Sequence, residues 1–366
     1  VRKDDSLPWS LDYFSQEIFK ATEQYGRNHV STGNALISLG DISLLLKKPN
    51  EAEKYFQEAL SIFEKCHTSG VPTISDTYEN LAVANLMLSD PDKALFNSIK
   101  KNENDRELIL NVFKFLNHED RLQFSKQFSP FNFFASLSAE EELAQAVLDW
   151  KGIVLDSIIQ ENIDFRDWEK KLENPQFADR IFNMNEDDFT AELAKHSAPS
   201  SMFNLSVNEL SKFLNEDTIL AEIIKFDKLD KDDFVVGFEC YGLILYQKEQ
   251  NSSKVEKKWI ELGAAIEVEK EILNLRNNIL NTNGNFLKSL QSISSYILER
   301  FENEIPPLTK NIIYCPDGEL NFVPYPALLT NDGKFLSERY GVFYISAGRD
   351  LGIKNLPLGS KNITVF

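Results

Sequence analysis

The stretch that decides the fold is residues 311–329, Asn-Ile-Ile-Tyr-Cys-Pro-Asp-Gly-Glu-Leu-Asn-Phe-Val-Pro-Tyr-Pro-Ala-Leu-Leu, in which a buried strand precedes a forced turn. Ile312–Tyr314 are β-branched or aromatic and favour a strand, which Pro316 ends because proline cannot donate to a ladder. The Asp317-Gly318 pair favours a tight reversal, since glycine readily takes a positive φ. Apolar residues at 320–323 then predict a short returning strand, so the stretch by itself predicts a hairpin.

The turn and the residues after it resemble the signature of CHAT domains, the caspase-like domains that follow tetratricopeptide (TPR) repeats. The signature positions are filled by Pro316, Asp317, Gly318, Leu320, Pro324, Tyr325, Ala327 and Leu328. The resemblance continues through residues 335–336, 340–346 and 350–351, and upstream through Trp259–Ile266. It implies an α/β domain of the caspase and separase type, in which a strand-end His activates a strand-end Cys.

In that family both catalytic residues follow the segment matched here. Asn362–Phe366 resembles the strand that opens the catalytic half. We therefore expect residues 205–366 to be the N-terminal, pseudo-caspase part of a CHAT domain.

The cysteines and histidines form no recognisable dyad. Cys66 and His67 are neighbours at the end of a predicted helix, where their side chains diverge by about 100°. Cys240 lies in an apolar run and Cys315 precedes the turn proline, so both are expected to be buried, with reactivity at Cys315 as the alternative. Three histidines lack metal-ligand spacing: His29, His118 and His196. We therefore predict no catalytic, cofactor-binding or metal residue, and no cofactor.

A repeat of 42 residues organises the first third of the chain. Leu39-Gly40 recurs as Leu81-Ala82 and Ala52 recurs as Ala94. The apolar spacing predicts paired antiparallel helices that resemble TPRs, with small residues set against large ones. Backwards, Tyr13-Phe14 precedes Tyr55-Phe56 by the same offset, which predicts a lone second helix near the start.

The third repeat departs from the pattern after Ala94, where Ser98 and Lys101 replace Phe and Ala. This predicts the end of the solenoid, with a polar outer face as its cap. The alternative is a plain helical bundle.

Three regions follow from these patterns. Residues 1–103 are predicted to be a TPR solenoid of about two and a half repeats, residues 104–204 a helical middle region with a polar insert, and residues 205–366 the α/β part. In the middle region, the aromatics of Phe128–Phe134 are expected to fill a core between helices.

The α/β part has its own expected elements. A short helix is expected at 207–214, strands at 218–226, 234–246 and 258–263, and helices over 266–279 and 286–301. A sheet covered by helices follows from that order.

Composition restricts the class of partner. The formal net charge is -18, which disfavours direct binding of nucleic acid. Three scattered cysteines and the absence of a long apolar run predict a cytoplasmic protein with no membrane span.

We therefore expect the partner-binding and structural half of a CHAT-type cysteine endopeptidase, with a protein or peptide partner in the TPR groove. One alternative is a scaffold or adaptor without catalysis, and another is a helical binding protein with an unrelated α/β domain. Enzymatic activity is left open, because no dyad can be assigned.

Overall fold

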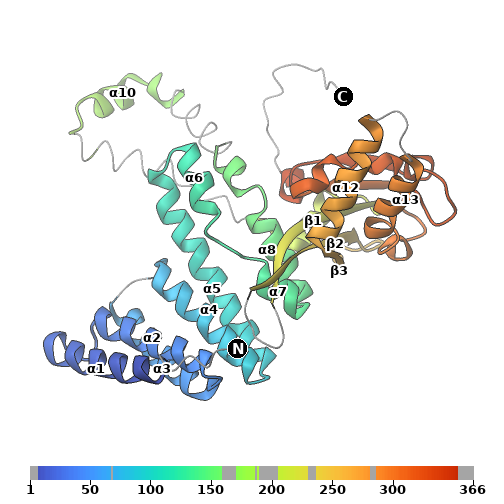
Figure 1. Cartoon of the computed structure of the whole chain (residues 1–366). Coiled ribbons are helices and arrows are strands. Elements are labelled where there is room, and N and C mark those ends of the chain that lie inside the picture. The colour runs from blue at the N-terminus through green and yellow to red at the C-terminus, as the bar shows by residue number, and fades with distance from the viewer. Residues whose placement is uncertain are drawn as a thin grey trace. The chain divides into compact units, whose positions relative to one another are not determined.

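The computed structural model describes residues 7–66, 69–158, 170–185, 188, 205–229, 236–280 and 286–352, although the side chains of residues 7–11 and Val236 are not described. The described chain divides into two compact units (Figure 1). The first unit is helical and takes described residues within 1–139, 153–202 and 229–237. The second contains the sheet and takes described residues within 140–152, 203–228 and 238–366.

The first unit is a succession of helices. They are α1 (Leu7–Tyr25), α2 (Val30–Leu45), α3 (Pro49–Cys66), α4 (Pro72–Met87), α5 (Pro91–Val112), the 3-10 turn η1 (Phe113–Phe115), α6 (His118–Ser125), α7 (Asn132–Leu137) and α10 (Pro175–Phe182), with further helical residues at 153–158. Helix α2 packs against α3, and α4 packs against α5, as the repeat predicted. Helix α1 packs against α2, where a lone second helix was expected.

The repeat is also visible at the helix ends. Lys47 and Ser89 both have a left-handed backbone, with φ of 57° and 58°, and each lies two residues before a proline that begins the next helix. A proline in the first turn loses no helical hydrogen bond, because the first N–H groups have no partner within the helix. The two turns are 42 residues apart in sequence and share one geometry.

Small residues face large ones between paired helices. A Cβ atom on Gly40 would lie 2.2 Å from Cε1 of Phe56, and one on Gly33 would lie 2.6 Å from Cε1 of Phe63. Both rings are fully buried. The close approach of the helices therefore depends on glycine at these two positions.

The prediction of a polar outer face on the third repeat was wrong. Ser98 and Lys101 are 3% and 9% exposed, and Asp105 is buried beside them. Lys101 Nζ lies 2.7 Å from Asp105 Oδ2, and Ser75 Oγ donates to the same carboxyl group. These side chains occupy the core positions of the preceding repeat, so the apolar contact is replaced by a satisfied polar one.

The predicted boundary at residue 103 falls inside α5, which runs on to Val112. The division into three regions therefore stays a prediction. In the middle region, Phe133 and Phe134 are 6% and 2% exposed, as expected of core residues.

The second unit holds a five-stranded sheet in the order β3-β2-β1-β4-β5. Its elements are α8 (Glu140–Trp150), η2 (Val207–Lys212), β1 (Thr218–Leu229), β2 (Val236–Lys248), β3 (Val255–Ala264), α12 (Ala265–Leu280), α13 (Phe286–Ile297), η3 (Glu302–Glu304), β4 (Asn311–Cys315), η4 (Gly318–Phe322), η5 (Tyr325–Ala327), η6 (Leu336–Glu338), β5 (Gly341–Tyr344) and η7 (Gly348–Gly352). Strand β4 pairs in parallel with both β1 and β5, and β2 pairs with β3 in antiparallel. The sheet is mixed. The strands expected at 218–226, 234–246 and 258–263 are confirmed over their described residues, as are the two expected long helices.

Alternation along β1 gives the sheet two different faces. Ile219, Ala221 and Ile223 join the core formed with α12 and α13. The intervening residues point the other way, since side chains of a strand alternate. On that second face Tyr246 Oη donates to Ala144 O of α8 over 2.9 Å, so α8 covers it.

The predicted hairpin at 311–329 was wrong. Residues 318–322 form the 3-10 turn η4, and β4 lies between two parallel neighbours. Leu320 and Val323 are buried in the core under α12 and α13, so their apolar character reflects packing of a turn. Similarly, the expected helix at 207–214 is the 3-10 turn η2. The predicted strand at 362–366 and residues His67 and His196 lie outside the described residues.

Candidate functional site

The signature turn after β4 is held by its own aspartate. Asp317 Oδ2 accepts a hydrogen bond from the backbone N–H of Lys225 on β1 over 3.0 Å, and Oδ1 accepts from Gly318 N–H over 2.8 Å. Both carboxylate oxygens therefore serve the backbone. Asp317 fixes the end of β4 to β1, which is a structural task.

Gly318 is needed for a close approach. Its φ is 54°, and a Cβ atom there would lie 2.5 Å from Tyr241 Oη. That hydroxyl accepts from Glu319 N–H over 3.2 Å and donates to Glu269 Oε1 over 2.9 Å. Burial raises the pKa of Tyr241, and the hydrogen bond to Glu269 raises it further. The Asp-Gly pair thus belongs to a hydrogen-bonded network that joins the turn to β1 and β2.

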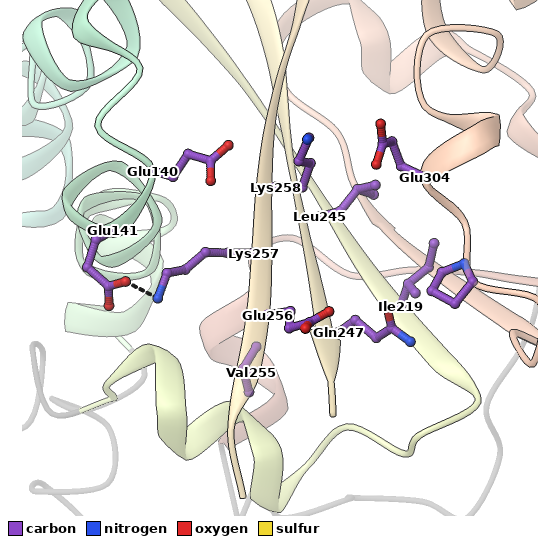
Figure 2. A pocket seen from close by; sticks show the side chains of 11 residues that line it. Glu140, Glu141, Ile219, Leu245, Gln247, Val255, Glu256, Lys257, Lys258 and Glu304 are labelled. Carbon is purple, nitrogen blue, oxygen red and sulfur yellow. Dashed lines mark ion pairs between the residues drawn. The ribbon is translucent and has the colours of Figure 1, made fainter. Parts of the chain in front are cut away.

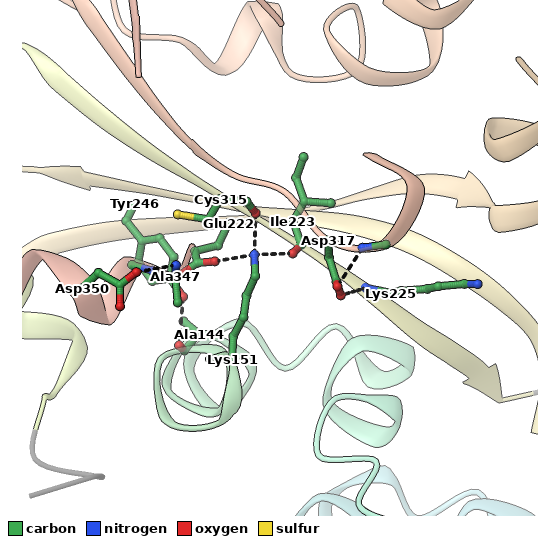
Figure 3. A network of polar contacts seen from close by, with 12 residues as sticks. Ala144, Lys151, Glu222, Ile223, Lys225, Tyr246, Cys315, Asp317, Ala347 and Asp350 are labelled. Atoms are coloured by element: carbon green, nitrogen blue, oxygen red, sulfur yellow. Dashed lines mark hydrogen bonds and ion pairs between the residues drawn. The ribbon is translucent and has the colours of Figure 1, made fainter. Parts of the chain in front are cut away.

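The carboxyl end of β4 is where a parallel sheet usually offers a binding crevice. Here Lys151, which follows α8, fills that place (Figure 3). Its Nζ lies 2.9 Å from Glu222 Oε2 and donates to Ile223 O over 2.8 Å and to Cys315 O. The three protons of the ammonium group therefore have three acceptors.

Glu222 is the most deeply buried charged group of this network. It is fully buried, and its Oε1 accepts from Gly348 N–H at the start of η7. Burial raises its pKa above the usual range, while the Lys151 ammonium opposes that shift. Asp350 Oδ2 accepts from Ala347 N–H over 3.0 Å and completes the same turn (Figure 3).

The cysteines behave as structural residues. Cys315 and Cys240 are both fully buried. Burial raises the pKa of Cys240 to about 11, and burial with the nearby Glu222 carboxylate raises that of Cys315 well above its usual value. Cys66 is exposed at the end of α3, where its Sγ donates to Asn28 O over 3.1 Å. Neither of the two buried thiols has the low pKa that a nucleophilic thiol needs.

The two described histidines lie at the starts of helices. His29 caps α2, with its Nδ1 accepting from Ser31 N–H over 3.2 Å, and its ring stacks on Tyr25. His118 begins α6. Within the described ranges, no group of three or more potential ligands could hold a metal ion.

A pocket of about 560 Å³ lies at the opposite end of the parallel strands (Figure 2). Ile219, at the start of β1, forms part of its wall. The Lys257 and Glu141 side chains, which both line it, form an ion pair, and Glu140 Oε1 accepts from Trp259 N–H over 3.1 Å. These contacts cover the outer edge of β3, which protects an edge strand from pairing with another chain.

The helical unit presents a polar face on α2 and α4. Asn80 Nδ2 of α4 donates to Asp41 Oδ1 of α2 over 3.3 Å, so these faces of the two helices lie side by side. Asn34, which lies about two helical turns before Asp41 on α2, and Asp76 of α4 are exposed. Burial raises the pKa of Asp41 and of Asp76. Asp41 forms no ion pair within the part of the chain that the structure describes.

Lys101 lies close enough to this face for its charge to lower the pKa of Asp76, against the larger effect of burial. Its Nζ lies 3.6 Å from Glu79 Oε2 and 2.7 Å from Asp105 Oδ2. Carboxylates therefore outnumber ammonium groups around α4. Sequence reasoning did not find this face, although the exposed positions of α2 and α4 could have been derived from the helical period.

Comparison with known families supports the presence of a helical repeat in the first unit. Residues 31–97 match the family model described as Tetratricopeptide repeat. The match covers α2 to α4 and the start of α5, and such repeats suggest interaction with another protein. No curated protein shows significant similarity to the chain. No helix among the described residues is both long and apolar enough to span a membrane. The chain thus carries a TPR region at residues 31–97, followed by an α/β unit with a mixed five-stranded sheet.

Proposed function

We propose that this protein binds a protein partner through the face shared by α2 and α4. The observation that carries the proposal is the TPR match at residues 31–97, together with the paired helices found there. TPR arrays present extended surfaces to segments of other proteins.

The chemistry of the face favours a basic or neutral segment. Asp41 and Asp76 are partly desolvated carboxylates, and Asp41 accepts a hydrogen bond from the neutral amide of Asn80 without an ion pair among the described residues. A lysine or arginine of a partner would supply the missing positive charge. Such an encounter is weakened by salt, because the carboxylates remain within reach of solvent ions.

Fluorescence polarisation with labelled peptides tests this proposal. The peptides share one length and one apolar pattern, and carry either lysine or glutamate at the polar positions. We expect the lysine peptide to bind more tightly, and the double variant Asp41→Asn/Asp76→Asn to lose most of that preference.

A charge-matched control separates the face from the net charge of -18. Glu23→Gln/Asp92→Asn removes the same charge from exposed positions on α1 and α5. Equal loss in both double variants, or no preference for lysine in the native protein, would reject the face as the binding surface.

We infer, as a second proposal, that the α/β unit is the non-catalytic half of a CHAT-type cysteine peptidase. It is supported by the signature residues Pro316–Gly318 and by the parallel order of β1, β4 and β5. A scaffold without catalysis is the alternative, and it is favoured by the buried thiols of Cys240 and Cys315.

The gene downstream of the Phe366 codon distinguishes these two functions. A peptidase requires a strand ending in His and a later strand ending in Cys. If both are encoded, replacing that Cys by Ala should abolish cleavage by the full protein. If either is missing, the peptidase proposal fails and the scaffold remains.

A further inference from the structure

Helix α8 packs in the sheet unit, although the residues that flank it in sequence belong to the helical unit. Residues 139 and 153 on either side of it are both assigned to the helical unit, whereas 140–152 are assigned to the sheet unit. Leu143, Val147 and Leu148 of α8 are buried. The chain therefore leaves the helical unit, inserts one helix into the sheet unit and returns.

The contacts of α8 differ in strength along its length. At its amino end, Glu141 pairs with Lys257, but the glutamate side chain is 67% exposed. At its carboxyl end, the Lys151 and Glu222 side chains are 11% and 0% exposed. A buried pair depends on its partner far more than an exposed one, because an unpaired buried charge is strongly unfavourable.

The contacts around Lys151 reach three segments of the sheet unit. The ammonium group bonds β1 at Ile223 and β4 at Cys315. Arg349 Nη1 of η7 donates to Asp149 O near the end of α8 over 2.7 Å. Gly152, the residue after Lys151, has φ of 77°, and a Cβ atom there would lie 3.2 Å from Ala347 Cβ. The carboxyl end of α8 is thus seated by a small number of coupled contacts.

We propose that Lys151 is a latch, whose withdrawal releases the carboxyl end of α8 from the ends of β1 and β4, while the pairing of these strands and the rest of the unit stay folded. The latch has two positions, since a partly withdrawn ammonium would leave the Glu222 carboxylate buried and unpaired. Opening would expose Glu222, the Gly348 N–H and the Cys315 thiol, which now face one another (Figure 3). Because both ends of α8 continue into the helical unit, a rearrangement there can act on the latch through the chain itself.

Cys315 provides a reporter for the open state. Its side chain is fully buried, so a thiol reagent reaches it only after opening. In a Cys66→Ser/Cys240→Ser background, Cys315 is the single thiol, because the chain has three cysteines. The rate of iodoacetamide labelling is measured in increasing urea, below the unfolding transition, and compared with global stability from circular dichroism.

A latch predicts labelling with a weak dependence on urea, because local opening exposes little surface. Lys151→Met should raise the labelling rate by about tenfold or more beyond the change expected from global stability. Gly152→Ala retains every charge and should act in the same direction, which keeps the test valid if Lys151→Met does not fold. Lys257→Met is the control, because it removes the ion pair between β3 and the amino end of α8. It should leave the excess labelling unchanged.

Two results would overturn the latch. One is labelling that follows global unfolding, with its full urea dependence, in the native protein and in both variants. The other is an equal effect of Lys257→Met and Lys151→Met, which would make Lys151 one stabilising contact among several.

Discussion

In the helical unit, a small residue on one helix faces a residue of complementary size on the next helix. The two sizes change together from one repeat to the next. Gly40 faces Phe56, whereas 42 residues later Ala82 and Ser98 stand at the same two positions. Ser98 Oγ donates to Ala94 O over 2.8 Å, so the smaller side chain remains satisfied. A methyl group on the first helix is therefore tolerated only where the aromatic ring is absent.

Gly40→Ala should lower the free energy of unfolding by about 1–3 kcal/mol, because the added methyl group overlaps a buried ring. Phe56→Ser alone should also destabilise, through the lost ring. The double variant Gly40→Ala/Phe56→Ser copies the later repeat, and should lose less than the sum of the two. Urea denaturation of all four proteins measures the coupling, and strict additivity would contradict the proposed contact.

Glu222 gives the sheet unit a pH dependence whose sign can be stated. Burial raises its pKa above the usual 4.5, despite Lys151. Its contribution to stability is therefore greatest below the unfolded pKa and is lost as the pH rises through the higher folded pKa. The difference in unfolding free energy between native protein and Glu222→Gln should fall over that interval and be flat on both sides. A difference that rises with pH would show that the ammonium outweighs burial.

At the scale of elements, the turn between β4 and η4 contacts β1 and β2, two strands that are distant from it in sequence. Asp317 bonds Lys225 N–H of β1, while Gly318 lets Tyr241 of β2 approach the same turn. The signature residues therefore hold three neighbouring strands of the sheet in register. This accounts for the Asp-Gly pair without any catalytic role.

Asp317→Ala should destabilise the sheet unit by about 1–3 kcal/mol, since two backbone N–H groups lose their acceptor. Asp317→Asn keeps one acceptor oxygen and should lose less. Glu319→Ala is a control in the same turn, because its ion pair with Arg276 joins side chains that are each 48% exposed. Thermal unfolding ranks the three variants, and an effect of Glu319→Ala equal to that of Asp317→Ala would reject this account.

At the scale of the whole molecule, the described chain combines a TPR region with a sheet unit whose thiols are closed off. Cys315 has its pKa raised by burial, and the described histidines His29 and His118 act in or beside helix starts. Among the described residues, the two thiols of the sheet unit are buried, and TPR repeats suggest interaction with another protein.

Residues 1–366 should therefore show no peptidase activity on a mixed peptide library. Mass spectrometry of the library before and after incubation provides the measurement. Cleavage that survives replacement of Cys66, Cys240 and Cys315 by Ala would indicate a contaminant. Cleavage lost with one of these replacements would show that the chain contains its own nucleophile.

The sequence by itself determined the local pattern of the chain. The helix pairs follow from apolar spacing and the 42-residue offset, and the strands follow from β-branched runs, because both depend on residues close in sequence. The sequence did not determine the partner of each apolar segment, so residues 320–323 were predicted as a strand, whereas residues 318–322 form a 3-10 turn.

Only the tertiary structure decided which polar residues are buried. Ser98 and Lys101 were expected on a polar outer face, yet they are buried together with Asp105. Lys151 and Glu222 are 71 residues apart and carried no motif, although they form an ion pair in which the glutamate side chain is fully buried. A buried charge is stable only beside its partner, and the position of that partner is fixed by packing between distant segments.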